Sequence, residues 1–243
     1  MRPCGRPALS AGCGTRDHTA NPRRHEERAV DRFGRMPETI EDYYERVEAA
    51  ADDTGRLAMN AEMQAWEVFP FESEGLQLKP LDPLTEAEAP RHGENPAQCR
   101  CSEQHSDDQW VVWSDDHWQV GLSEESGAPL LLILSPWAHH DFTTLPKGLA
   151  AEMGQIMVAL GAAIESLPSV ARVHVSKWGD GGAHAHIFFY ARPTRMPQLR
   201  GTMMAVWDDY LPRVPGDVRD ANVRAVIADL VGSYGGRALG RAV

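Results

Sequence analysis

Two histidines separated by a single residue, His184 and His186, are the clearest candidates for chemistry in this sequence. They follow the glycine-rich turn 179–182, whose backbone N–H groups can line an anion-binding hollow. Because side chains alternate along a strand, the two imidazoles are expected to share one face about 6.5 Å apart. An imidazole nitrogen can attack phosphorus and leave again at neutral pH, so the pattern indicates a covalent catalyst that acts on a phosphate.

The histidine pair alone is open to two other interpretations. Two partly buried histidines satisfied by hydrogen bonds would produce the same pattern. Both rings could also bind one catalytic metal ion together with a carboxylate, although the long helix expected before the histidine strand argues against this arrangement.

The strands that must position these residues follow from the hydrophobic pattern. Residues 110–113 and 118–122 predict two strands joined by a tight turn. Residues 129–135 form a continuous apolar run, which predicts a central strand buried on both faces. Two further strands are expected over residues 170–178 and 183–191, around a turn in which glycines permit positive φ.

Helical spacing marks the other elements. Apolar residues of 147–167 lie on one stripe, which predicts an amphipathic helix laid on a sheet. A last helix is expected over residues 217–231, before a glycine-rich tail. Because consecutive strands are mostly neighbours in space, this order predicts an α+β fold with a mostly antiparallel sheet.

The order of elements and the motifs together resemble the histidine triad (HIT) superfamily, including its galactose-1-phosphate uridylyltransferase-like members, over residues 99–193. The matching features are a hairpin turn with Asp115-Asp116, a strand ending in Pro136-Trp137-Ala138-His139, a long helix, and the run Gly181-Gly182-Ala183-His184-Ala185-His186-Ile187-Phe188. The resemblance implies a HIT-like fold whose partner is a nucleotide or a nucleotide-sugar-like small molecule. It also implies a homodimer by analogy, since such domains often pair edge strands.

The same resemblance implies roles for individual residues. His186 would be the nucleophile of a hydrolase or nucleotidyltransferase, while His184 and the amides of Gly181 and Gly182 would bind the phosphate. The third triad position is Phe188, which cannot bind phosphate, so the triad is incomplete. A non-catalytic nucleotide-binding or zinc-stabilised module is therefore the alternative. In a second register, Gly182 would take the first position and His184 would be the nucleophile.

Three arginines follow the histidine strand, namely Arg192, Arg195 and Arg200. A guanidinium group there can grip a distal phosphate or an acceptor. A solvated loop explains the three residues equally well.

Two cysteines give a second indication. Cys99 and Cys101 precede the predicted hairpin, at the place where uridylyltransferase-like relatives carry a Cys-x-x-Cys half-site for zinc. The resemblance implies that Cys99, Cys101, His139 and His184 hold a structural Zn²⁺ ion in a tetrahedral S2N2 site. The cysteine spacing here is one residue shorter, and free thiols near the surface are the alternative.

The composition is that of a soluble globular protein, with 243 residues, 42% hydrophobic and 24% charged. Lys and Arg number 24 against 35 Asp and Glu, a net charge of −11 that disfavours binding to nucleic acid. The longest aliphatic run, residues 130–134, is too short to cross a membrane, and no N-terminal stretch is typical of a secretory signal. We therefore expect a cytoplasmic protein with no membrane partner.

Charge and periodicity also divide the chain. Residues 1–35 carry 8 Arg and 4 acidic residues without an apolar period, so we expect a disordered basic segment, either upstream of the natural start or bound to an acidic partner. Residues 36–98 are expected to form a helical arm, with helix over 37–66, and an irregular connection. Residues 99–193 would be the HIT-like core, and residues 194–243 a C-terminal helical extension and tail.

Overall fold

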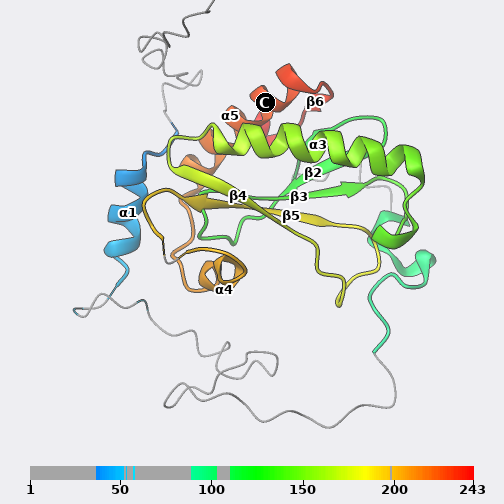
Figure 1. Cartoon of the computed structure of the whole chain (residues 1–243), viewed down its shortest axis with the longest axis horizontal. Helices are drawn as coiled ribbons and strands as arrows, with labels where there is room; N and C mark the ends of the chain where they lie inside the picture. Colours follow the sequence, from blue (N-terminus) through cyan, green and yellow to red (C-terminus); the bar gives the residue numbers. More distant parts are fainter. Residues whose placement is uncertain (1–36, 52, 54–56, 58–88, 103–109, 198) are drawn as a thin grey trace, which may run out of the picture.

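The computed structural model describes residues 37–51, 53, 57, 89–102, 110–197 and 199–243, which are coloured in Figure 1. The expectations for residues 1–35, and for most of the arm that follows, lie outside these ranges. The described residues form an α+β fold, as the sequence predicts. Its frame is one sheet with strand order β4-β5-β3-β2-β1-β6.

Every strand pairing in this sheet is antiparallel. The strands are β1 (Val111–Ser114), β2 (Trp118–Leu122), β3 (Leu131–Pro136), β4 (Val170–Ser176), β5 (Ile187–Pro193) and β6 (Arg237–Ala238). The predicted hairpin is β1 and β2, and the predicted central strand is β3, which lies between β2 and β5. Sequence neighbours thus pair as the alternating and apolar runs indicate.

Two helices, α3 (Lys147–Glu165) and α5 (Gly216–Ser233), cover one face of the sheet (Figure 1). Ile156, Leu160 and Ile164 of α3 are fully buried in a core that also contains Trp113 and Trp118. By length and composition, α3 is the one helix in the described part of the chain that could cross a membrane. Here its apolar stripe packs on the sheet, which confirms the predicted amphipathic helix.

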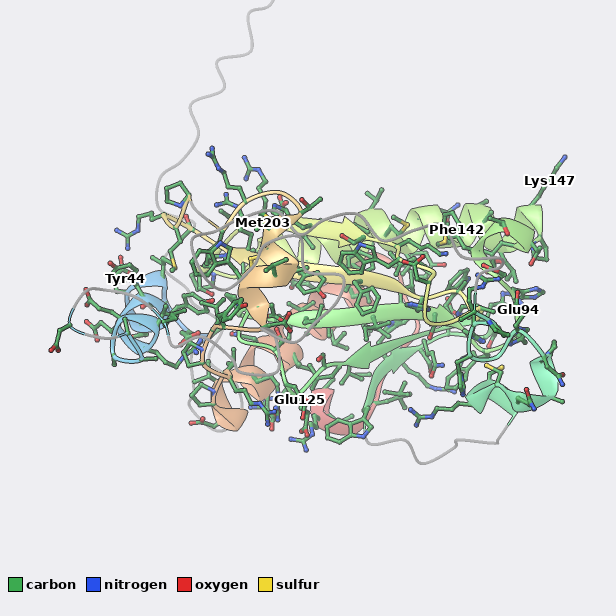
Figure 2. All side chains as sticks on the ribbon, turned by 90° about the horizontal axis from the view of Figure 1, so that it is seen from below. Tyr44, Glu94, Glu125, Phe142, Lys147 and Met203 are labelled. Carbon is green, nitrogen blue, oxygen red and sulfur yellow. The ribbon has the colours of Figure 1, made fainter. Side chains whose placement is uncertain are left out.

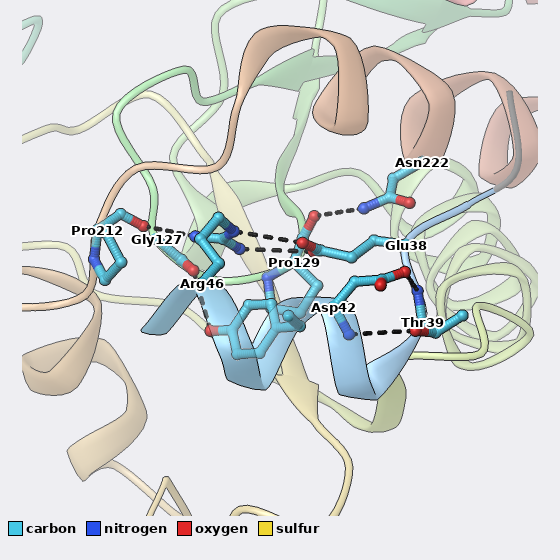
Figure 3. Close-up of polar contacts among 9 residues, drawn as sticks. Glu38, Thr39, Asp42, Arg46, Gly127, Pro129, Pro212 and Asn222 are labelled. Carbon is cyan, nitrogen blue, oxygen red and sulfur yellow. Dashed lines mark hydrogen bonds and ion pairs between the residues drawn. The ribbon is translucent and has the colours of Figure 1, made fainter. Parts of the chain in front are cut away.

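The opposite face of the sheet is partly covered by the short helices α1 (Ile40–Glu48) and α4 (Met203–Asp208). Figure 3 shows how α1 is fastened: Arg46 donates to Glu38 and to the carbonyl oxygen of Pro212. The buried Tyr43 hydroxyl donates to the carbonyl oxygen of Gly127 at 3.0 Å. The helix expected over residues 37–66, with a break near Thr54-Gly55, is present as α1 from Ile40 to Glu48; residues 58–66 lie outside the described residues.

Asp208 at the end of α4 anchors the loop before β3. Its Oδ1 accepts hydrogen bonds from the Ser126 hydroxyl at 2.8 Å and from the N–H groups of Gly127 at 3.0 Å and Ala128 at 2.8 Å. Burial raises the pKa of Asp208, although these hydrogen bonds act in the opposite direction. The sequence alone suggests no role for the acidic residues 208–209. The structure gives Asp208 a structural role, because it accepts hydrogen bonds from the loop before β3.

Three further expectations are corrected. The strand expected over residues 183–191 is β5, which begins at Ile187. The N–H groups of Ala183 and Ala185 donate to carbonyl oxygens outside the sheet, so these residues do not join the strand. The tail after α5 contains β6, which pairs with β1 after Gly235 and Gly236 adopt positive φ. Residues 179–182 do not adopt positive φ, since the glycines that do so lie elsewhere in the described chain.

The remaining described segments are short 3-10 helices: η2 (Pro96–Gln98), η3 (Arg100–Ser102), η4 (Phe142–Thr144) and η5 (Gly240–Ala242). Figure 2 places Glu94 and Phe142, which flank or belong to these segments, at one end of the molecule and Tyr44 at the other. The predicted cysteine, histidine and glycine site residues gather at the end marked by Glu94 and Phe142, whereas the arginines do not: Arg195, for example, pairs with Glu41 of α1.

Candidate functional site

Four side chains with metal-binding atoms meet where β3 ends and the chain approaches β5. They are Cys99, Cys101, His139 and His184, and their ligand atoms all lie within 4.8 Å of one another. Cys99 Sγ is 3.6 Å from His184 Nδ1, and Cys101 Sγ is 3.4 Å from His139 Nδ1. Zn–S and Zn–N bond lengths in a tetrahedron place sulfur and nitrogen about 3.6 Å apart, so the donors nearly have the spacing of a zinc site.

The surroundings also fit a metal. The Nε2 atom of His184 lies 2.9 Å from the carbonyl oxygen of Pro136, which can only accept, so Nε2 carries the proton. Nδ1 therefore presents its lone pair toward Cys99, the orientation that an outer hydrogen bond gives a metal-binding histidine. Burial lowers the pKa of His184 and keeps the ring neutral. The four residues predicted from the resemblance thus fit a structural zinc ion.

Backbone geometry explains how a Cys-x-Cys pair can serve this site. Cys99 closes the turn of η2, its N–H bonded to the carbonyl oxygen of Pro96, and Cys101 lies in η3. Burial, together with a hydrogen bond that the Cys101 S–H donates to Cys99, raises the pKa of the Cys101 thiol to about 11. A bound cation would reverse this by favouring the thiolate, so metal binding should release protons.

His186 has a different set of contacts. Its Nδ1 lies 2.7 Å from the carbonyl oxygen of His184 and must donate to it, so the lone pair of the neutral ring is on Nε2. The ring meets Phe188 edge to face, with centroids 5.3 Å apart. A Cβ at Gly182 would come within 3.3 Å of Cε1 of His186, so glycine is needed there for space. The ring is therefore oriented by its neighbours as a nucleophile requires.

The loop before His186 is held by a segment that the sequence assigns only to an irregular connection. The N–H of His92 donates to the carbonyl oxygen of Gly181, and the N–H of Ala183 donates to that of His92, both at 3.0 Å. These bonds form a parallel bridge between His92 and Gly182. Beside it, Arg91 pairs with Asp141 at 2.7 Å. No sequence signal marks this pairing, because it joins residues about ninety positions apart.

A surface groove of about 450 Å³ crosses the sheet face opposite α3. It is lined by Arg100, Trp110, Val111, Gln119, Gly121, Leu122, Glu124, Glu125, Ile133 and Ser135. Ile133 pairs with Phe188, and continuing this register by two residues along β3 brings Ser135 level with His186. The groove therefore lies on the face of the sheet at whose end His186 is found, and Ser135 is the lining residue level with that histidine.

Two predicted roles are not supported by the geometry. Arg192 lies six residues beyond His186 along β5, about 20 Å away on an extended chain, so the structure does not bring it to the site. Both ring nitrogens of His184 face other partners, Cys99 and the Pro136 carbonyl oxygen, which favours the metal-ligand role over phosphate binding. Gly181 and Gly182 do lie in the loop beside His186.

No protein-family model and no curated protein matches the chain. Among solved structures it is similar to a zinc-bound histidine triad family protein from Mycobacterium smegmatis, at 17% identity and a TM-score of 0.37, over 50% of this chain and 84% of that one. It is also similar to a histidine triad protein from Marinobacter aquaeolei, at 20% identity and a TM-score of 0.40, over 50% of this chain and 88% of that one. A structure of a uridylyltransferase matches at 10% identity and a TM-score of 0.40, over 55% of this chain and 45% of that one.

These similarities agree with the resemblance to histidine triad and uridylyltransferase-like proteins that the sequence motifs indicate. They cover about half of the chain at TM-scores below 0.5. The function is therefore argued from the residues of the site itself.

Proposed function

We propose that this protein binds a nucleotide or a nucleotide-sugar-like phosphoester and cleaves it through a covalent nucleotidyl-histidine on His186. The observation that carries the proposal is the hydrogen bond from Nδ1 of His186 to the carbonyl oxygen of His184. This bond fixes the tautomer in which Nε2 of the neutral ring is free to attack. A groove of nucleotide size lies on the same face of the sheet, with Ser135 in its lining.

The groove gives the nucleoside part of such a substrate a place to bind. Its lining includes Ile133 and Trp110, both suited to the flat face of a base. Glu124 and Glu125 also line it; each carboxylate pairs with arginine and has further lone pairs that can accept hydrogen bonds from sugar hydroxyls. A nucleoside lying there would direct its α-phosphate toward the end of β5, where His186 precedes the strand.

The reaction follows from the orientation of the ring. The Nε2 lone pair of His186 forms a bond to the α-phosphorus, and the bond from phosphorus to the leaving oxygen breaks with its electron pair. The amides of Gly181 and Gly182 are proposed to stabilise the charge that develops on the equatorial oxygens. Water, or the phosphate of a second substrate, then attacks the same phosphorus and releases His186, giving a hydrolase or a nucleotidyltransferase respectively.

The metal site supports this chemistry without taking part in it. A zinc ion held by Cys99, Cys101, His139 and His184 would supply a rigid cross-link between segments distant in sequence. Because the carbonyl oxygen of His184 accepts the proton of Nδ1 of His186, fixing the residue at 184 also fixes the ring at 186.

A second candidate function is a non-catalytic, zinc-stabilised nucleotide-binding module. Phe188 favours it, since this ring packs edge to face on His186 where a phosphate-binding side chain would be expected. Such a module would bind nucleotides without forming a covalent intermediate.

We also propose a cytoplasmic location and a homodimeric assembly for this protein. Cys99 and Cys101 are not joined in a disulfide, as expected in a reducing compartment, which supports a cytoplasmic protein. β4 is at one edge of the sheet and can pair with β4 of a second copy, which supports a homodimer.

Trapping distinguishes the two candidate functions. The full chain is incubated with α-labelled nucleoside triphosphates, diphosphates and nucleotide sugars, then denatured and assayed for acid-labile label. The nucleotidyl-transfer proposal requires label on wild type, none on His186→Ala, and an unchanged level on the control His117→Ala, whose ring is exposed and pairs with Glu152. Nucleotide binding without label on wild type would establish the module instead.

A further inference from the structure

His92, which lies outside the histidine motif, is bonded through its backbone to the loop that precedes His186. Its backbone forms the parallel bridge with Gly182, through the two hydrogen bonds that flank that residue. Bridged residues of neighbouring strands project their side chains to the same side, from backbones about 4.8 Å apart. The side chain of His92 therefore leaves its backbone on the side where a side chain at position 182 would lie.

That side is the one occupied by His186. The Cβ position of Gly182 is 3.3 Å from Cε1 and 3.8 Å from Nδ1 of the His186 ring. The side chains of His92 and His186 thus lie on the same side of the Gly182 backbone. Because glycine occupies this position, the space between them is left open.

The backbone of His92 is firmly held, whereas its side chain is exposed to solvent. On one side, Arg91 pairs with Asp141 at 2.7 Å and its N–H donates to Glu94 at 3.0 Å. On the other side, Gly93 adopts a φ of +75° and packs closely against Cys99. An exposed imidazole on a fixed backbone is suited to binding a ligand, since little order must be gained when it binds.

We propose that His92 is a phosphate-binding residue of this site. The inference rests on the function proposed above: while Nε2 of His186 attacks the phosphorus, a ring N–H of His92 donates a hydrogen bond to a non-bridging oxygen of the same phosphate. His92 thereby supplies the contact that Phe188 cannot make. The partner it recognises is the phosphate of a nucleoside phosphate, not the base or the sugar.

Binding and trapping of the full chain test this role. The variants are His92→Ala and His92→Gln, with His117→Ala as the matched exposed-histidine control. Affinity is measured for a nucleoside monophosphate and for the parent nucleoside, and the rate of label transfer is measured with the α-labelled triphosphate. Removing a phosphate donor should weaken the monophosphate at least tenfold, leave nucleoside affinity unchanged, and slow labelling roughly 100-fold. Glutamine, which keeps an N–H donor, should restore much of both losses.

The outcomes separate this inference from the function on which it rests. If wild type takes no label, covalent transfer fails, yet a selective loss of monophosphate affinity in His92→Ala still supports the phosphate contact. If wild type is labelled and His92→Ala matches it in rate and in affinity, the His92 inference is wrong and the transfer proposal stands. Equal losses for monophosphate and nucleoside would also overturn the inference. Zinc content and melting temperature of each variant show whether the neighbouring segment is intact.

Discussion

Substituting His139 is predicted to abolish zinc binding and the stability that zinc confers, whereas substituting the adjacent His140 is not. The group of potential ligands contains His139 and not His140. We therefore expect wild type to bind one Zn²⁺ per chain, His139→Ala to lose it, and His140→Ala to retain it. The pair is well matched, because the substitutions are of the same type and occupy neighbouring positions in the same loop.

The stabilisation expected from zinc can be estimated, because the four ligand atoms are already close to the positions that a zinc ion requires. The two sulfur–nitrogen distances, 3.4 and 3.6 Å, are already close to those of a zinc tetrahedron. All four ligand atoms lie within 4.8 Å of one another, about 1 Å more than the widest ligand–ligand spacing in such a site. Little binding energy is therefore spent on moving the segments. At free zinc between about 100 and 1,000 times the Kd, stabilisation is about 2.7–4.1 kcal/mol, or roughly 5–16 °C in Tm.

The assay is thermal unfolding of metal-free protein titrated with zinc, with bound metal measured by elemental analysis. Wild type and His140→Ala should rise together in melting temperature, and His139→Ala should stay near its metal-free value. Two results would refute the reasoning: wild type that binds no zinc, or a loss in His140→Ala as large as in His139→Ala. In either case the four donors would be neighbours without being ligands.

Three other predictions concern single side chains. Asp208→Ala strands buried donors in the loop before β3 and should cost roughly 2–4 kcal/mol in urea unfolding, whereas Asp208→Asn, which keeps an acceptor, should cost less. Burial lowers the pKa of His174 below 6.5, so the unfolded chain binds the proton more readily and stability falls as pH drops below that value; His174→Gln should show a smaller loss between about pH 7 and about pH 5.5. Gly182→Ala crowds the ring of His186 and should slow labelling about tenfold, while Gly154→Ala on α3, whose Cβ meets nothing within 4 Å, should not; equal rates in the two variants would contradict this packing.

Local sequence patterns are sufficient for the elements that depend on local contacts. The strand predicted at 118–122 is β2 in full, since alternation along five residues and the preceding turn determine it. The helix predicted at 147–167 is α3 with only its end displaced, because an apolar stripe on one face is enough to place it on a sheet. The zinc ligands depend on distant contacts, and they were reached only through the resemblance of the motifs to a known superfamily.

Features that depend on contacts between distant segments were not predicted, because the partners of such contacts leave no local pattern in the sequence. The strand expected from residue 183 starts at Ile187 because the N–H of Ala183 bonds to His92 and that of Ala185 bonds to His140, and neither partner is a sheet neighbour. A single strand pattern cannot reveal such partners. His92 itself lies in a polar, proline-rich stretch with no periodic signal, so its place beside His186 becomes visible only in three dimensions.

The arrangement around His184 shows why a metal site and a nucleophile can be one residue apart without competing. Along an extended chain, the ring and the carbonyl group of one residue point in different directions. The ring of His184 faces Cys99 and is anchored by the carbonyl oxygen of Pro136, at the end of the buried strand β3. Its own carbonyl oxygen faces Nδ1 of His186. The proposed metal ligand would therefore orient the proposed nucleophile through a single peptide unit, and both are anchored by a strand that the hydrophobic core already holds in place.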